Sequence, residues 1–245
     1  MSRLPRLRFG LIGLGAFGAF CRPHLERLGP VAGHDPAWPG SDSLAEAASR
    51  DIVVLAVPVA RLAEAARAIA PHLRPGAVVV ELCSLKTRPL ATLRALLPRH
   101  VRVLGLHPLF GPQSARDGIV GLRVVVDPSG GAAARLAARL LHRLGLAVVW
   151  MTAEEHDQQM AWVQGLTHLL ARLVQGLDMP ELPHRTRSFD RLMDALGMVS
   201  QDSEALFRTI TEENPFMPEV KARLLAGAEA LLRAPADQGE DTLAA

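Results

Sequence analysis

Three short segments of the chain carry residues whose types and spacing could do chemistry: residues 13–18, 84–86 and 107–112. The first has glycines at positions 13, 15 and 18, between a predicted strand and a predicted helix. There the glycines permit a tight turn, let a pyrophosphate approach the backbone, and allow close packing of helix on strand. We therefore predict a dinucleotide-binding turn rather than a plain glycine-rich turn. The predicted cofactor contacts are Gly13, Gly15, Ala16, Phe17 and Gly18, with Val57 and Pro58 at the end of a later strand.

A hydroxyl, an ammonium and an imidazole follow two later strands. Ser84 and Lys86 come after the predicted strand 77–82, and His107 comes after the predicted strand 101–106 and before a proline. Open α/β sheets bind ligands at the carboxyl ends of their strands. We therefore expect a nicotinamide cofactor and a polar reacting centre to meet at this edge. The alternatives are an N-cap role for Ser84 and a surface or helix-start position for Lys86.

Asp35 ends the predicted second strand, about 17 residues after the last glycine of the turn. Its carboxylate can accept hydrogen bonds from ribose hydroxyls and repel a 2′-phosphate. No lysine or arginine follows it closely. This favours NAD over NADP as the cofactor, against the alternative of a turn-forming aspartate before Pro36.

Strands and helices alternate in the first part of the chain, which predicts an α/β fold with a doubly wound parallel sheet and room for an antiparallel edge. The predicted strands are 8–12, 31–35, 51–57, 77–82, 101–106, 121–126 and 146–151. Beyond residue 151 only helices are predicted, over 154–177, 189–196, 203–211 and 218–233. We therefore predict a dinucleotide-binding domain at 1–151 and a helical substrate and dimerisation domain at 152–245.

The composition excludes several classes of protein. The chain has 245 residues, a formal net charge of +2 and no long Lys/Arg block, so no nucleic-acid or membrane partner is expected. Cys21 and Cys83 lie far apart, which indicates reduced thiols without metal-ligand spacing. His156 and His168 are also too widely spaced for a zinc site, so no metal is predicted. With no signal peptide or membrane span in the sequence, a cytoplasmic protein is expected.

Together these segments resemble the prephenate/arogenate dehydrogenase family of tyrosine biosynthesis, from about residue 7 to residue 232. The resemblance rests on the glycine turn, on 84–86, on 107–111, and above all on 154–157 followed by 164–168. It implies a Rossmann-type sheet domain followed by an all-helical domain. The family often has Asp-Val-Gly or Asp-Val-Ala before the serine, where this chain has Glu81, Leu82 and Cys83.

The resemblance also implies roles for individual residues. His107 resembles the histidine that receives the proton of the substrate's ring hydroxyl, and Ser84 the serine that orients this hydroxyl and the nicotinamide. His156 and His168 match histidines that line the substrate pocket, and Lys86 is assigned to substrate binding with them. For the substrate carboxylate Arg187 fits best, with Arg185 and Arg191 as alternatives.

The reaction implied is NAD-dependent oxidative decarboxylation of prephenate to 4-hydroxyphenylpyruvate, with arogenate as a second substrate. A homodimer through the helical domain is expected with it. Two alternatives are kept: a β-hydroxyacid or imine reductase, and a nucleotide-sensing regulator without catalysis. The histidines of the second domain count against the first alternative, and the Ser84/His107 pair counts against the second. The choice between prephenate and arogenate, and feedback inhibition by tyrosine, stay open.

Overall fold

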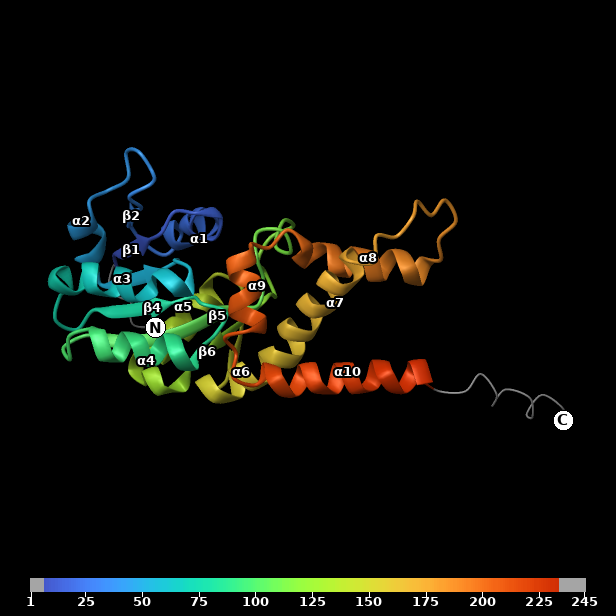
Figure 1. The fold of residues 1–245 in the computed structure, drawn as a ribbon. Coiled ribbons are helices and arrows are strands. Elements are labelled where there is room, and N and C mark those ends of the chain that lie inside the picture. Colours follow the sequence, from blue (N-terminus) through green and yellow to red (C-terminus); the bar gives the residue numbers. More distant parts are fainter. Residues whose placement is uncertain (1–6, 234–245) are drawn as a thin grey trace.

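The computed structural model describes residues 7–233 (Figure 1). Its first part is a seven-stranded sheet of order β2-β1-β3-β4-β5-β6-β7. Strands β1 to β5 are parallel, β6 is antiparallel to β5, and β7 is parallel to β6. The predicted doubly wound sheet is thus confirmed, and its antiparallel edge consists of two strands. The strands are β1 (Phe9–Ile12), β2 (Val31–His34), β3 (Ile52–Leu55), β4 (Val78–Glu81), β5 (Arg102–Pro108), β6 (Arg123–Val126) and β7 (Ala147–Trp150).

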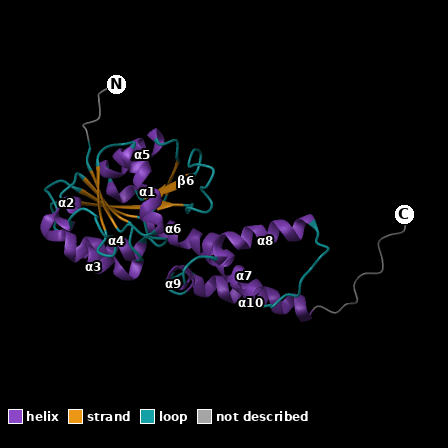
Figure 2. Ribbon diagram, turned by 90° about the horizontal axis from the view of Figure 1, so that it is seen from above, coloured by secondary structure: helices purple, strands orange, loops and turns teal. Residues whose placement is uncertain are grey.

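Helices cover both faces of this sheet, which explains the continuous apolar runs of its central strands. One face packs on α2 (Leu44–Ala48), α3 (Val59–Ile69) and α4 (Thr87–Leu96). The other packs on α1 (Ala16–Glu26) and α5 (Ala132–Arg143) (Figure 2). Two short elements of this part were not predicted from the sequence: the single-turn helix α2, capped by Ser43, and a 3-10 turn at Pro128–Gly130.

The second part of the chain is helical, as predicted. It consists of α6 (Ala153–Met160), a π-helical turn (Ala161–Gly165), α7 (Leu166–Gln175), α8 (Arg187–Ser200), α9 (Glu204–Thr211) and α10 (Met217–Arg233). Helix α7 leads away from the sheet, α8 returns, α9 lies beside the sheet part, and α10 runs outward again (Figure 1). We call the outward-pointing group of α7, α8 and α10 the arm. Within residues 7–233 no helix is long and apolar enough to cross a membrane.

Candidate active site

The glycine turn lies between β1 and α1. Gly13 has a φ of +94°, which L side chains rarely adopt, and a Cβ on Gly18 would overlap the carbonyl oxygen of Gly13. Gly15 faces open space at the N-cap of α1, whose first turn carries no acidic residue and no side-chain cap. Free N–H groups and open space fit a pyrophosphate. Val57 lies against this turn at Gly13, and Pro58 is the N-cap of α3.

Asp35 follows β2 and is tied to the same turn. Its Oδ2 accepts a hydrogen bond from the N–H of Leu14 at 2.8 Å, and its Oδ1 accepts one from the N–H of Ala37 at 2.9 Å. These backbone hydrogen bonds hold the pKa of the Asp35 carboxyl below its usual value. An ionised carboxylate therefore lies beside the phosphate-binding turn.

Three buried side chains form a chain of hydrogen bonds at the carboxyl edge of the sheet. His107 is near the end of β5, and its Nδ1 lies 2.7 Å from Nε2 of His156. Nδ1 of His156 in turn lies 2.8 Å from Oδ1 of Asp157. None of the three residues is more than 4% exposed. The structure thus brings two predicted histidines together and adds a carboxylate that the sequence reading did not select, although it directly follows His156.

The Asp157 carboxylate caps the start of α4. Its Oδ1 accepts from the N–H of Lys86 at 2.7 Å, and its Oδ2 accepts from the N–H of Thr87 at 2.9 Å. Burial raises the pKa of the Asp157 carboxyl, but hydrogen bonds from His156 and Thr87 outweigh it and bring the pKa below its usual value. The amide of Asn214 donates to the Asp157 carbonyl at 2.8 Å. The helical part is therefore joined to the sheet part at this site.

The surroundings of the two histidines disfavour a proton on either ring. Burial is the largest cause that lowers the pKa of His107, and the nearby His156 and Lys86 lower it further, so that this pKa lies well below its ordinary value. Burial also lowers the pKa of His156, although the hydrogen bond to Asp157 works against it. Both imidazoles are thus neutral at neutral pH.

A neutral imidazole has one donor and one acceptor, so the hydrogen bonds assign the tautomers. Asp157 can only accept, so Nδ1 of His156 carries the hydrogen. Nε2 of His156 then accepts from Nδ1–H of His107. This leaves Nε2 of His107 as a hydrogen-bond acceptor, and none of residues 7–233 donates to it.

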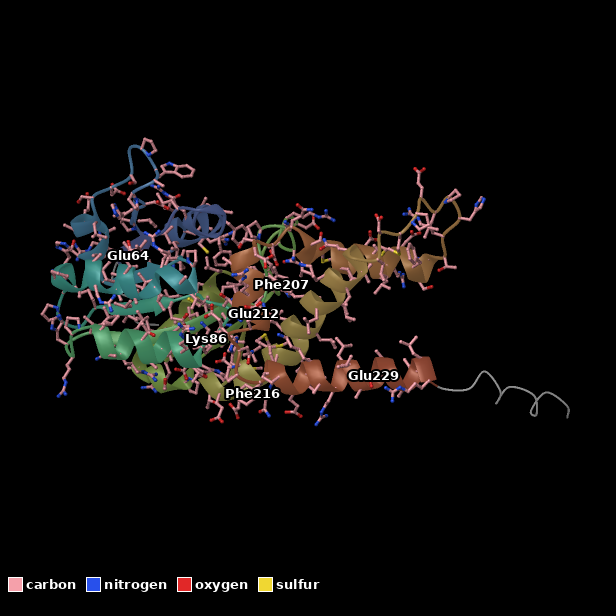
Figure 3. All side chains as sticks on the ribbon, viewed as in Figure 1. Glu64, Lys86, Phe207, Glu212, Phe216 and Glu229 are labelled. Atoms are coloured by element: carbon pink, nitrogen blue, oxygen red, sulfur yellow. The ribbon has the colours of Figure 1, made fainter. Side chains whose placement is uncertain are left out.

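Ser84 and Lys86 lie in the turn between β4 and α4. Ser84 is half-buried and is not the N-cap of α4, because the helix begins at Thr87 with Lys86 at the cap. Lys86 lies where the sheet part meets the helical part (Figure 3). Its side chain is 1% exposed, and its Nζ lies 2.5 Å from Oε1 of Glu81. The charge of Lys86 is thus paired inside the protein, and its predicted contact with the substrate remains a prediction.

A π-helical turn at residues 161–165 interrupts the long helix predicted over 154–177. In an unbroken α-helix, His156 and His168 would be offset by about 120° around the axis. A π-turn takes up one extra residue, which reduces that offset to about 20°. The two histidines therefore lie on the same face. The turn accommodates α10 closely, because a Cβ on Gly165 would overlap the Met217 sulfur.

His168 is buried, and both its ring nitrogens have partners within the protein. Nδ1 lies 2.8 Å from the carbonyl oxygen of Gln164, and Nε2 lies 3.0 Å from Oδ2 of Asp202. The fixed ring lies on α7, which follows α6 and its His156 after the π-helical turn. Its predicted contact with the substrate remains a prediction.

The three candidate arginines lie at or near the start of α8, at the outer end of the arm, away from β5 and α6, which carry His107 and His156 (Figure 1). Arg187 is the first residue of α8, at the tip of the arm where residues 176–186 turn back (Figures 1 and 2). Arg185 precedes it and pairs with Asp190 at 3.0 Å on the surface, and Arg191 is exposed in the first turn of α8. Within one chain, the structure does not bring Arg187 together with His107.

Comparison with known proteins identifies the family. Residues 37–131 match the family model described as prephenate dehydrogenase, nucleotide-binding domain. A 4-amino-4-deoxyprephenate dehydrogenase of Streptomyces pristinaespiralis is 32% identical over 228 residues, which cover 88% of this chain and 74% of the relative. The chain belongs to the prephenate/arogenate dehydrogenase family. The predicted family is thus confirmed, and with it the prediction of an NAD-dependent dehydrogenase.

Other members of the prephenate/arogenate dehydrogenase family match over similar lengths. Arogenate dehydrogenase 2, chloroplastic, of Arabidopsis thaliana is 28% identical over 243 residues, which cover 89% of this chain and 67% of the relative. The structure of prephenate dehydrogenase from A. aeolicus in complex with hydroxyphenyl propionate and NAD+ superposes with a TM-score of 0.72 at 22% identity, covering 95% of this chain and 93% of that one. This likeness confirms the predicted Rossmann-type fold.

Proposed function

We propose that this enzyme catalyses the NAD-dependent oxidative decarboxylation of prephenate to 4-hydroxyphenylpyruvate, and that it also accepts arogenate. The observation that carries the proposal is the buried chain from Asp157 through His156 to His107. It gives His107 a defined tautomer, with Nε2 as an acceptor at the carboxyl edge of β5. An acceptor of this kind suits a substrate whose ring hydroxyl must release its proton while a hydride departs from the same carbon.

The reaction needs few protein groups. When bound, NAD supplies the hydride acceptor; Gly13, Gly15 and Gly18 would hold its pyrophosphate and Asp35 its ribose. The hydride leaves ring C4, the ring carboxylate departs as carbon dioxide, and the bonding electrons of that carboxylate complete the aromatic ring. As the hydride leaves C4, the hydroxyl oxygen shares electrons with that carbon and its proton becomes more acidic, so His107 Nε2 accepts this proton. The proton returns to the oxygen once the electrons of the departing carboxylate have completed the aromatic ring. Ser84 orients the same hydroxyl.

The carboxylate contact of Arg187 requires a second copy of the chain. The arm carries leucine and methionine side chains that are 49% to 67% exposed, and such apolar patches are typical of interfaces. We propose that the arms of two copies pack together as a homodimer, and that Arg187 serves the site of the partner chain. The exposed side chains are Leu173, Leu192, Met198 and Leu225 on the arm helices, and Leu177 in the turn just after α7.

Mixed dimers test this arrangement. Arg187→Ala should raise the Michaelis constant for prephenate steeply, because a desolvated carboxylate left unpaired costs about 3–5 kcal/mol. Arg185→Ala and Arg191→Ala are the matched controls. When Arg187→Ala chains are exchanged with His107→Asn chains, one site of each mixed dimer regains both residues if Arg187 acts on the partner. Recovery of activity supports the assignment, and no recovery in verified mixed dimers contradicts it.

A second candidate substrate is 4-amino-4-deoxyprephenate, favoured by the 32% identical relative named for that compound. A ring amine can donate to His107 Nε2 as a hydroxyl does. Catalytic efficiency with NAD should be measured for prephenate, arogenate and the 4-amino compound under identical conditions. The proposal expects prephenate to give NADH and 4-hydroxyphenylpyruvate at the highest efficiency. Absence of turnover with prephenate beside turnover of the amino compound would reassign the substrate, and no turnover of any would refute the proposed reaction.

A further inference from the structure

A buried ion pair lies beside the histidines and belongs to neither the glycine turn nor the hydrogen-bonded chain. Glu81 is the last residue of β4, and its Oε1 lies 2.5 Å from Nζ of Lys86, with neither side chain more than 1% exposed. Oε2 of Glu81 accepts from the N–H of Cys83 at 2.9 Å. Taking two charges out of water is unfavourable, so this pair calls for a functional explanation.

The pair occupies the face of the sheet from which His107 projects. In the register of β4 and β5, Glu81 is opposite Gly105. Side chains two residues apart on a strand point to the same face, so His107 follows Gly105 on that face. A Cβ on Gly105 would lie 3.0 Å from Oε1 of Glu81 and 3.2 Å from Cδ of Lys86. The glycine therefore leaves room for the Lys86 stem to cross β5 two residues before His107.

The charged groups around the two histidines shift the pKa of the rings in opposite directions. The Lys86 ammonium lowers the pKa of both His107 and His156, in addition to the effect of burial. Asp157 acts in the opposite direction, because its hydrogen bond raises the pKa of His156. The charged groups that act on the two rings are thus Asp157 from α6 and Lys86 from the turn before α4, and Glu81 from β4 pairs with Lys86.

We propose that Glu81 and Lys86 are positioning residues for the proton acceptor. The carboxylate holds the ammonium against β5, and the ammonium keeps a proton off both rings, so that His107 Nε2 stays an acceptor in a site that Asp157 would otherwise make more basic. This inference rests on the proposed role of His107.

The test compares Lys86→Met with the double variant Glu81→Gln/Lys86→Met. The single variant leaves the buried carboxylate of Glu81 unpaired and can fail to fold for that reason, whereas the double variant removes both charges. Lys86→Arg keeps the cation, and Arg88→Met, which removes an exposed cation from the first turn of α4, is the matched control. The acid limb of kcat/KM against pH should move upward by about one unit in both Lys86→Met proteins. It should stay near the wild-type position in Lys86→Arg and Arg88→Met.

A titration of the histidine rings by NMR, without substrate, separates this inference from the proposed reaction. The resonances of His107 and His156 should titrate at higher pH in the folded double variant than in the wild type. If they titrate unchanged, and activity falls equally at every pH, the pair is only structural and the inference is overturned. If prephenate is not turned over but the ring titration moves as expected, the inference stands and the proposed substrate fails.

Discussion

His156 fixes the tautomer of His107, and replacing it tests this role closely. His156→Phe keeps a ring of similar size but removes the acceptor for the His107 Nδ1–H, which lies 2.7 Å away in a fully buried position. His156→Gln instead offers a carbonyl oxygen near the position of Nε2. The two variants therefore differ mainly in whether His107 keeps its partner.

The size of the expected loss of kcat follows from the cost of an unpaired buried donor. In His156→Phe the buried Nδ1–H of His107 would have no acceptor, which costs about 1–3 kcal/mol. His107 therefore leaves its productive form, with Nδ1 protonated and Nε2 free to accept, by changing tautomer or by rotating its ring. At about 1.4 kcal/mol per tenfold change, the productive form falls by roughly 5–150-fold. We expect kcat of His156→Phe to fall by that factor with NAD affinity unchanged. The loss of kcat in His156→Gln should stay within about tenfold.

The assay is steady-state formation of NADH with prephenate, together with a direct measurement of NAD binding. His142→Phe, the same change at an exposed position on α5, is the matched control. Equal losses of kcat in the Phe and Gln variants, both folded, would refute the tautomer argument. So would a His156→Phe enzyme with wild-type turnover.

Three further predictions concern the cofactor site and the pH dependence. We expect the wild type to prefer NAD over NADP by about ten- to a hundred-fold, and Asp35→Ser should reduce this preference because the repulsion of the 2′-phosphate disappears. Equal use of both cofactors by the wild type would contradict the contact assigned to Asp35. Gly18→Ala should lower stability by about 1–3 kcal/mol in thermal unfolding, whereas Gly15→Ala, which faces open space, should weaken NAD binding and leave the unfolding temperature unchanged. Protonation of His107 would remove the Nε2 acceptor, and the pKa of this histidine is lowered by burial. We therefore expect kcat/KM to stay constant around neutral pH and to fall only well below pH ~6.5. A fall of kcat/KM that begins above that pH would contradict a neutral His107.

The sheet and its reacting edge could be predicted because they depend on local pattern. Apolar runs such as residues 52–55 identify strands, and the spacing of Gly13, Gly15 and Gly18 is read directly from the sequence. His107 follows the same logic, since a polar residue at the carboxyl end of a buried strand faces a ligand edge.

The remainder of the site depends on contacts between distant residues. Asp157 reaches the N–H of Lys86 across 71 positions in the sequence, and no local pattern indicates that contact. The π-turn places His156 and His168 on one face, although an unbroken helical period puts them about 120° apart. The spacing of Glu81 and Lys86 likewise does not reveal that their side chains pair inside the protein. The resemblance assigns Arg187 to the substrate carboxylate, yet α8 begins at the tip of the arm.

The central claim is that His107, held as a neutral acceptor, is the base at the reacting edge. Its most direct test is His107→Asn, which keeps a polar side chain and removes the base. We expect kcat with prephenate and NAD to fall by about 10²–10⁴ while the dissociation constant of NAD stays within about twofold of the wild type. A folded His107→Asn enzyme that turns over prephenate at close to the wild-type rate would contradict the account.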